Sequence, residues 1–446
     1  MAGGNWTAQN KVRPGIYINF KSESSPPPAQ GTRGVVAIAK ALSWGGAGVM
    51  EIEAGADTTP YIGCPITAPQ AMFLRELFKG TNVSGGPAKV LLYRLPAAGE
   101  AAAAAELGGG VTATALYPGA RGNDISVSIA ADVNDPDSFV VTTMVDGAVA
   151  DRQLVKDAAG LVPNGWVKFS GTGTLTAAAG VTLTGGADGT AEASAYAAAL
   201  EALEPHHFDV LAYDGTDSTV RQAMAAFVRR LAEQNGRYCQ LVASGAQGAD
   251  SPYVISTNSG VVLEDGTQLA AHEVVWWLAG AEAGAQYDRS LTYAAYPGAA
   301  DAAARQTDSQ IEAELRAGNI VLTREFGSVR IESDINTLTT YTPDMGRVFH
   351  KNTTMRVCSS LANDLYREFS LNYLGKVKNN EEGRGLFKAA VLGYLKTMYD
   401  RGALGRRPTG DDITVERGEE ADSLVIAVAI QVGDAVEKIY LTVSVS

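Results

Sequence analysis

The last ten residues of the chain, EKIYLTVSVS, carry the β pattern that most constrains how this chain can fold. Apolar and polar side chains alternate, and most residues are β-branched or aromatic, so the pattern predicts a strand with one apolar face. An unpaired strand of this kind exposes backbone donors and acceptors beside an apolar stripe, an arrangement that recruits other chains. The segment therefore has to join either the chain's own sheet or a neighbouring molecule. The residues assigned to this strand are Ile439, Tyr440, Leu441, Thr442, Val443, Ser444 and Val445.

A second strand pattern lies near the N-terminus, in RPGIYINF. Pro14 and Gly15 precede a short alternation of apolar residues with other residues. The stretch that follows, residues 21–34, is rich in Ser and Pro and predicts a tether rather than a core. Fully extended, such a tether spans on the order of 45 Å, which is wider than a small domain. The residues assigned to this strand are Ile16, Tyr17, Ile18, Asn19 and Phe20.

Bulk composition excludes several classes of function. The 49 acidic and 36 basic side chains give a net charge of −13, which argues against nucleic acid as a partner. Cys64, Cys239 and Cys358 show no metal-binding spacing and predict buried thiols in a reducing compartment. No apolar run reaches the length of a membrane span, and the N-terminus shows no signal peptide. We therefore expect a protein made in the cytoplasm, without direct membrane insertion.

Periodicity and composition divide the 446 residues into five segments. Residues 1–33 form an N-terminal arm and linker. Alternating helix and strand patterns in residues 34–95 and 190–340 predict the two parts of an α/β core. Between them, residues 96–189 show short alternating strands separated by Gly, Pro, Asn and Asp, which predicts an inserted β-sandwich. Two amphipathic helices and the final strand predict an α+β C-terminal domain in residues 341–446. The predicted fold class is thus multidomain α/β, with a discontinuous core, an inserted all-β domain and a C-terminal domain that carries a terminal arm.

Reactive motifs are missing from the sequence. It contains neither a nucleophile elbow, nor a phosphate-binding loop, nor a dinucleotide fingerprint, nor a zinc-protease signature. His206 and His207 are adjacent, so their side chains point in different directions, which favours a solvated loop over a metal site. Glu381 and Glu382 lie in a polar stretch flanked by Gly, which favours a solvated loop over acid–base chemistry. We therefore predict no catalytic residue, no metal and no cofactor.

One region departs from the acidic background. Between residues 376 and 407 there are eight basic and three acidic side chains, a local charge of +5. Either this region forms a face for an acidic partner, or it is a solvated helix pair with uneven charge. The residues assigned to the candidate acidic-partner face are Lys376, Lys378, Lys388, Lys396 and Arg401.

Five stretches, in this order along the chain, resemble the contractile phage tail sheath protein family. They are RPGIYINF, LYPGARGNDISVSI, LTGGADG, NYLGKVKNNEEGRGLFKAAVLGYL and EKIYLTVSV. The resemblance implies a structural, non-enzymatic subunit of a virion tail sheath, synthesised and assembled in the host bacterial cytoplasm. It implies a helical homo-oligomer whose terminal strands are exchanged between subunits and whose contraction drives an inner tail tube through the target envelope. The implied partners are the tube protein, which the basic residues would face, and baseplate and tail terminator proteins.

Other interpretations remain open on the sequence. The sheath of a phage-like bacteriocin or of another contractile injection machine would share the same architecture. An enzyme on the α/β core would require a pocket with convergent titrating groups. A cell-surface array or adhesin protein would require a secretion signal.

Overall fold

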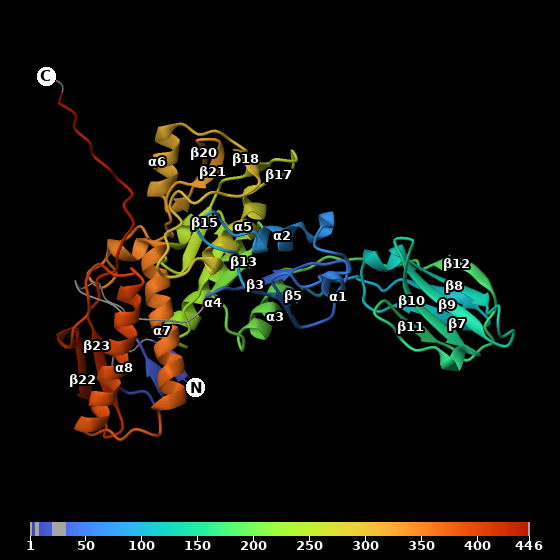
Figure 1. The fold of residues 1–446 in the computed structure, drawn as a ribbon, viewed down its shortest axis with the longest axis horizontal. Helices are drawn as coiled ribbons and strands as arrows, with labels where there is room; N and C mark the ends of the chain where they lie inside the picture. Colours follow the sequence, from blue (N-terminus) through green and yellow to red (C-terminus); the bar gives the residue numbers. More distant parts are fainter. Residues whose placement is uncertain (1, 5–8, 20–32, 445–446) are drawn as a thin grey trace. The chain divides into compact units, whose positions relative to one another are not determined.

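The structure, a computed structural model, describes residues 2–4, 9–19 and 33–444, and Figure 1 shows it as a ribbon. The chain folds into two compact units. One unit comprises residues 1–37, 73–90 and 206–446, and the other comprises residues 38–72 and 91–205. The predicted fold class, a mixed α/β chain with an inserted β-sandwich and an α+β C-terminal domain, is confirmed. The five segment boundaries drawn from the sequence stay predictions.

The central sheet of the described chain has seven strands in the order β19-β15-β14-β13-β3-β5-β4. β13, β14, β15 and β19 pair in parallel with their neighbours. Helix α4 (Ser218–Glu233) connects β13 to β14, as a parallel pair requires, and Asp217 caps it by accepting a hydrogen bond from the Thr219 N–H at 2.7 Å. The strands are β3 (Val35–Lys40), β4 (Val49–Glu53), β5 (Lys89–Arg94), β13 (Val210–Tyr213), β14 (Gln240–Ser244), β15 (Val254–Thr257) and β19 (Asn319–Ile320).

Several smaller elements accompany this sheet. The remaining helices are α1 (Thr59–Ile62), α2 (Met72–Phe78), α3 (Ala193–Leu203), α5 (Ala271–Gly284), α6 (Asp308–Arg316), α7 (Asn352–Asn372) and α8 (Glu381–Asp400). The small sheets are made by β1 (Ala2–Gly4) with β2 (Gly15–Tyr17), β16 (Val261–Leu263) with β17 (Gln268–Leu269) and β18 (Ala299–Ala302), β20 (Leu322–Glu325) with β21 (Ser328–Ile331), and β22 (Ile413–Arg417) with β23 (Leu424–Val428).

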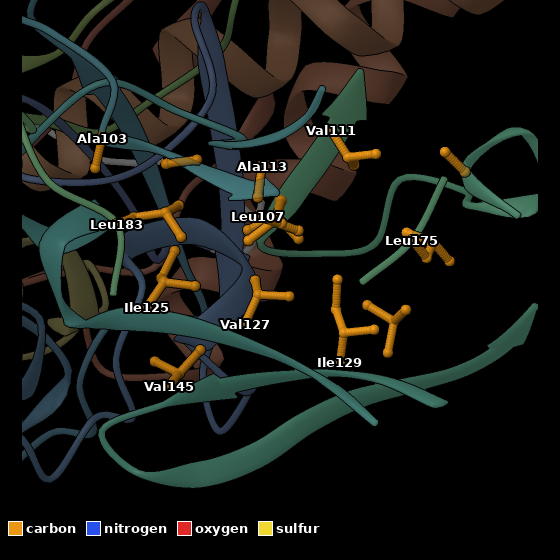
Figure 2. Close-up of a cluster of buried hydrophobic side chains, with 14 of the residues drawn as sticks. Ala103, Leu107, Val111, Ala113, Ile125, Val127, Ile129, Val145, Leu175 and Leu183 are labelled. Carbon is orange, nitrogen blue, oxygen red and sulfur yellow. The ribbon is translucent and has the colours of Figure 1, made fainter. Parts of the chain in front are cut away.

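The inserted segment forms a β-sandwich from two antiparallel sheets, β10-β9-β8-β12 and β11-β7-β6. Buried and partly buried positions alternate along β7 and the first five residues of β8, as a strand with one face in the core requires. Figure 2 shows Ile125, Val127 and Ile129 of β8 facing Leu107 and Ala113 of the other sheet. The strands are β6 (Ala104–Gly108), β7 (Val111–Ala115), β8 (Ile125–Ala131), β9 (Phe139–Val145), β10 (Ala148–Val155), β11 (Val167–Ser170) and β12 (Ala178–Thr182).

The core of this sandwich also contains Trp44, from the loop between β3 and β4. The Trp44 side chain is 1% exposed, and its ring centroid lies 4.9 Å from that of Trp166 and 5.2 Å from that of Tyr117. Gly63, at φ +75, leaves room for it, because a Cβ there would lie 2.7 Å from the Trp44 ring. The sandwich thus takes part of its core from outside the inserted sequence.

One loop prediction was wrong. Glu381 and Glu382 lie in the first turn of α8 and not in a solvated loop. Asn380 caps this helix, since its Oδ1 accepts a hydrogen bond from the Gly383 N–H at 2.8 Å. Acidic side chains in the first turn are stabilised by the positive end of the helix dipole, so this pair has a structural reason for its place.

Candidate subunit interface

The C-terminal strand pattern has no partner strand within the described chain. From Gly433 to Ser444 the backbone forms neither helix nor strand, and the red end of the ribbon joins no sheet (Figure 1). Its large apolar side chains are exposed, from 72% for Val443 to 91% for Tyr440. Thr442 and Ser444 are exposed as well, and Val445 lies outside the described residues. We call residues 438–444 the C-terminal arm.

The C-terminal arm leaves the folded chain at Glu437. Thr292 Oγ1 donates a hydrogen bond to Glu437 Oε1 at 2.8 Å, and Lys351 Nζ donates to Glu437 Oε2. The Glu437 side chain is 17% exposed, in contrast to the apolar residues that follow it. The arm is therefore fixed at its base and solvated beyond it.

This anchor is connected to a buried group of charges. Thr292 Oγ1 also accepts a hydrogen bond from the Asp334 N–H at 3.0 Å. The Asp334 carboxylate binds the Arg356 guanidinium, which in turn donates to Glu282 Oε2 at 2.5 Å. The three charged side chains are at most 1% exposed. The base of the C-terminal arm is thus bonded to a network that joins α5, α7 and the segment around Asp334.

The two carboxyl groups of this network, Glu282 and Asp334, differ in how readily they ionise. Burial, together with the nearby Asp334 carboxylate, raises the pKa of Glu282 to about 8, although the Arg356 charge acts in the opposite direction. Burial opposes ionisation of Asp334 too, but the Arg356 charge and hydrogen bond lower its pKa below the ordinary value. Glu282 is therefore the protonated member of the pair near neutral pH, and Asp334 carries the negative charge beside Arg356.

The raised pKa of Glu282 makes stability depend on pH. Between about pH 4.5 and 8 the folded chain holds a proton that the unfolded chain has released, so the free energy of unfolding falls as pH rises. Glu282→Gln keeps the position neutral and removes this loss. We expect the variant to gain about 3 kcal/mol relative to wild type from pH 5 to pH 8, measured by chemical denaturation.

The matched control for this change is Glu312→Gln, on the exposed face of α6. It should track wild type across the same pH range. Parallel stability curves for Glu282→Gln and wild type would show that the buried carboxyl is already ionised at low pH.

The N-terminal strand pattern lies against the chain's own C-terminal domain. The observed strand β2 is shorter than predicted, and it pairs in parallel with β1. Ile16 packs on the apolar cluster between α7 and α8, and Tyr17 Oη donates to the Arg13 carbonyl at 2.9 Å. The Ile18 carbonyl accepts a hydrogen bond from Tyr238 Oη at 3.1 Å. Asn19 follows in no regular element, and Phe20 lies outside the described residues.

Most of the predicted tether also lies outside the described residues. At its end, Arg33 is buried, and the Gly34 N–H donates to Asp209 Oδ2 at 2.9 Å. The described end of the tether is therefore fixed to the α/β core of its own unit.

The C-terminal domain contains a sheet of only two strands, β22 and β23, within the described chain. One face of this sheet packs on α8 and its apolar cluster through Ile413, Val415 and Ile426. Neither strand pairs with a third strand among the described residues. Isolated two-stranded sheets are only marginally stable in water, and both outer edges of this one lack a partner strand in the described chain.

The residues of the predicted basic face lie along α8 and just beyond both of its ends. Lys376 and Lys378 lie in the loop before α8, Lys388 and Lys396 lie on α8, and Arg401 follows its end. Since α8 has 20 residues, these charges extend over about 30 Å. All except the half-buried Lys388 are exposed, so they form a stripe rather than a compact patch.

The described residues contain neither a metal site nor a membrane-spanning helix. In the part of the chain that the structure describes, no group of three or more His, Cys, Asp or Glu side chains is placed to hold a metal ion. The described helices include none that is long and apolar enough to cross a membrane. The three cysteines are buried, as predicted.

Comparison with known proteins shows the family. Three family models match in sequence order: the phage tail sheath protein beta-sandwich domain over residues 97–188, the central domain over residues 189–337 and the C-terminal domain over residues 344–446. The chain is 35% identical to the phage-like element PBSX protein XkdK of Bacillus subtilis, over 100% of both chains. Among solved structures, a sheath tail protein from Desulfitobacterium hafniense matches with a TM-score of 0.85 and 41% identity, covering 96% of this chain and 99% of that one. A sheath tail protein from Listeria innocua matches with a TM-score of 0.78 and 30% identity, covering 93% and 96%.

The chain therefore belongs to the contractile phage tail sheath protein family. It is a structural subunit of a tail sheath, and since the family is a structural one, the chain is not an enzyme. The resemblance seen in the sequence is confirmed.

Proposed function

We propose that copies of this chain polymerise helically around an inner tail tube and are joined by exchange of their terminal β-strands. The observation that carries this proposal is the C-terminal arm, which is fixed at Glu437 and exposes its apolar residues beyond it. A strand pattern with one apolar face, together with a sheet whose two outer edges lack a partner strand in the described chain, fits β-augmentation between neighbouring copies. Because donor and acceptor lie at different places on each copy, the contact is heterologous and can propagate as an open helix.

The expected strength of one such joint is substantial. Each new backbone hydrogen bond contributes about 1 kcal/mol net, and each buried Ile, Leu or Val side chain contributes about 1.5–3 kcal/mol. Ile439, Leu441 and Val443 share the apolar face of the C-terminal arm. Ordering the exposed arm offsets part of this gain, so stability comes from many joints rather than from one.

The N-terminal strand is proposed as a second exchanged element, around Ile16, Tyr17 and Ile18. The Ser- and Pro-rich sequence that follows it would be long enough to let this strand extend to a neighbouring copy. In the single chain β2 packs on its own domain, so exchange would replace contacts within one copy by the same contacts between copies.

Contraction is proposed to drive the tube through the target cell envelope. Paired strands would hold neighbouring subunits together while the subunits rotate as rigid bodies between two lattices. The energy would be stored as a difference in interface free energy between the lattices, since a sheath subunit carries out no reaction. Assembly would take place in the host cytoplasm, with baseplate and tail terminator proteins at the two ends.

The basic stripe along α8 supports contact with an acidic surface of the tube. Lys388 and Lys396 lie on the helix itself, and Lys376, Lys378 and Arg401 extend the positive charge beyond both of its ends. Such contacts would weaken at high ionic strength, because salt screens exposed charges.

Negative-stain electron microscopy of the purified full-length chain tests the proposal. We expect hollow cylinders with regular transverse striations, because a heterologous joint whose rotation does not close repeats as an open helix. Flat arrays, closed rings or particles of single-chain size at every concentration would contradict helical polymerisation.

A further inference from the structure

The strands β20 and β21 form a hairpin (Figure 1), and Phe326 lies in the turn at its tip. Phe326 is 92% exposed, although the side chains at the other end of this hairpin, Leu322 and Ile331, are buried. An exposed Phe gains nothing from the hydrophobic effect in the single chain. The single chain therefore offers no packing reason for this residue.

The backbone offers no reason for Phe326 either. Glu325 pairs with Ser328, so Phe326 and Gly327 form a two-residue turn, with φ values of +48° and +84°. Turns of this type favour Asn or Asp before Gly, because a bulky residue at positive φ is strained. The equivalent turn between β9 and β10 has Asp146 at that position, as the rule predicts. Phe326 thus breaks a local rule without a compensating contact, and such departures mark functional positions.

A groove on the surface of α7 and α8 contains a second residue, Gly393, that breaks a local sequence rule without a contact to explain it. Its volume is about 360 Å³, and its lining includes Leu365, Tyr373, Ala390, Gly393 and Tyr394. Gly393 lies in the interior of α8, where Gly is destabilising relative to Ala. A Cβ at Gly393 would meet nothing within 4 Å, so close packing inside this chain does not require Gly there. The missing side chain leaves the groove open to something from outside.

We propose that Phe326 of one copy inserts into the α7–α8 groove of a second copy. The inference rests on the proposed polymerisation, which places copies of this chain next to one another. An aromatic ring fits a groove of this size, and Tyr373 and Tyr394 supply the aromatic walls with which such a ring packs well. This single contact would explain why Phe326 is exposed at a strained turn position and why Gly393 lies inside a helix.

Charge supports the same pairing. Arg324 is exposed on the hairpin two residues before Phe326, and Glu368 lines the groove. Glu368 Oε1 accepts a hydrogen bond from Asn372 Nδ2 at 3.0 Å, which holds the carboxylate in place. An Arg324–Glu368 pair between copies would set the direction in which the hairpin enters. Since hairpin and groove are different surfaces, this contact is also heterologous and can repeat along the same open helix.

Cysteine cross-linking between two variants tests the contact directly. Cys64, Cys239 and Cys358 are buried, and burial raises the pKa of Cys239 and Cys358 to about 12, so the native thiols react slowly. Glu325→Cys places a thiol beside Phe326 without removing the ring, and Thr397→Cys places one in the groove lining. The two variants are mixed, assembled and treated with a short bismaleimide.

We expect a covalent dimer in the mixture and no dimer in either variant alone. The matched control mixes Glu325→Cys with Val133→Cys, which puts an exposed thiol on the β-sandwich and should give no dimer. Assembled cylinders that yield no dimer from the Glu325→Cys and Thr397→Cys mixture would overturn the proposal. Equal cross-linking in the control mixture would also overturn it.

Phe326→Asn and Gly393→Leu give a second readout. Asn suits the turn, and Leu suits the helix, so neither change should lower the melting temperature of the single chain. Both should raise the concentration needed for assembly by about tenfold or more, while Val133→Asn should leave it unchanged. Unchanged assembly of Phe326→Asn, together with loss of assembly when the C-terminal arm is removed, would reject this contact and keep strand exchange.

Discussion

Removal of residues 439–446 should leave the chain folded and abolish long cylinders. These residues make no strand or helix in the described chain, and the anchor at Glu437 stays in place. Circular dichroism and the melting temperature should therefore match those of the full chain, since few intramolecular contacts are lost. Electron microscopy should show no long polymer, because each joint between copies loses its donated strand.

Two substitution variants test whether assembly needs the apolar side chains of the C-terminal arm or only a chain of that length. Replacing Ile439, Leu441 and Val443 by Ser removes the apolar face while the backbone remains able to pair. Replacing Thr442 and Ser444 by Ala changes the opposite face and serves as the control. We expect the first variant to behave like the truncation and the second like wild type. Normal cylinders from the truncated chain would refute exchange of the C-terminal strand.

Trp44→Ala should strongly destabilise the β-sandwich. The substitution empties a site that is 1% exposed and removes two aromatic contacts, with Tyr117 and Trp166. Truncation of a buried Trp to Ala costs about 3–5 kcal/mol. We expect this loss in the free energy of unfolding of the sandwich, measured by hydrogen exchange of the β7 and β8 amides.

The control for this experiment is Val133→Ala, at a position that is 96% exposed. It should change the free energy of unfolding by less than about 0.5 kcal/mol. A loss below about 1 kcal/mol for Trp44→Ala would mean that the inserted residues form a sufficient core on their own.

Local patterns in the sequence predicted much of the fold. The inserted sandwich follows from alternation and turn residues, and the Asp146–Gly147 pair, a usual hairpin sequence, forms the turn between β9 and β10, with φ values of +51° and +77°. Helix α4 buries one face, and the sequence indicates that face because its apolar residues recur at helical spacing. These features depend on residues close in sequence, which is why the sequence alone indicates them.

Features that depend on distant residues were not predicted. Trp44 precedes the sandwich by about fifty residues, and the surrounding Gly-rich loop gives no strand or helix pattern. Glu282, Asp334 and Arg356 come from three separate elements, and no spacing rule connects them. The helix start at Glu381 was missed because the Gly residues at positions 383 and 385 disguise it, although Asn380 is a usual capping residue.

The C-terminal arm shows both what the sequence could predict and what it could not. Alternation identified the C-terminal strand, since the period of two is visible in the sequence itself. The anchoring role of Glu437 could not be seen there, because Thr292 and Lys351 lie far away along the chain.

The bonding of Glu437 also determines how the subunit would respond to mechanical load. A pull on the last residues enters the molecule through Thr292 and the Asp334 backbone and reaches Arg356 and Glu282 between two helices. Glu437 is held by Thr292 and Lys351 at once, so such a pull loads these two bonds together, whereas peeling a hairpin would break its bonds singly. Tension on the C-terminal arm would therefore be resisted at Glu437, inside the folded domain, rather than along the arm itself.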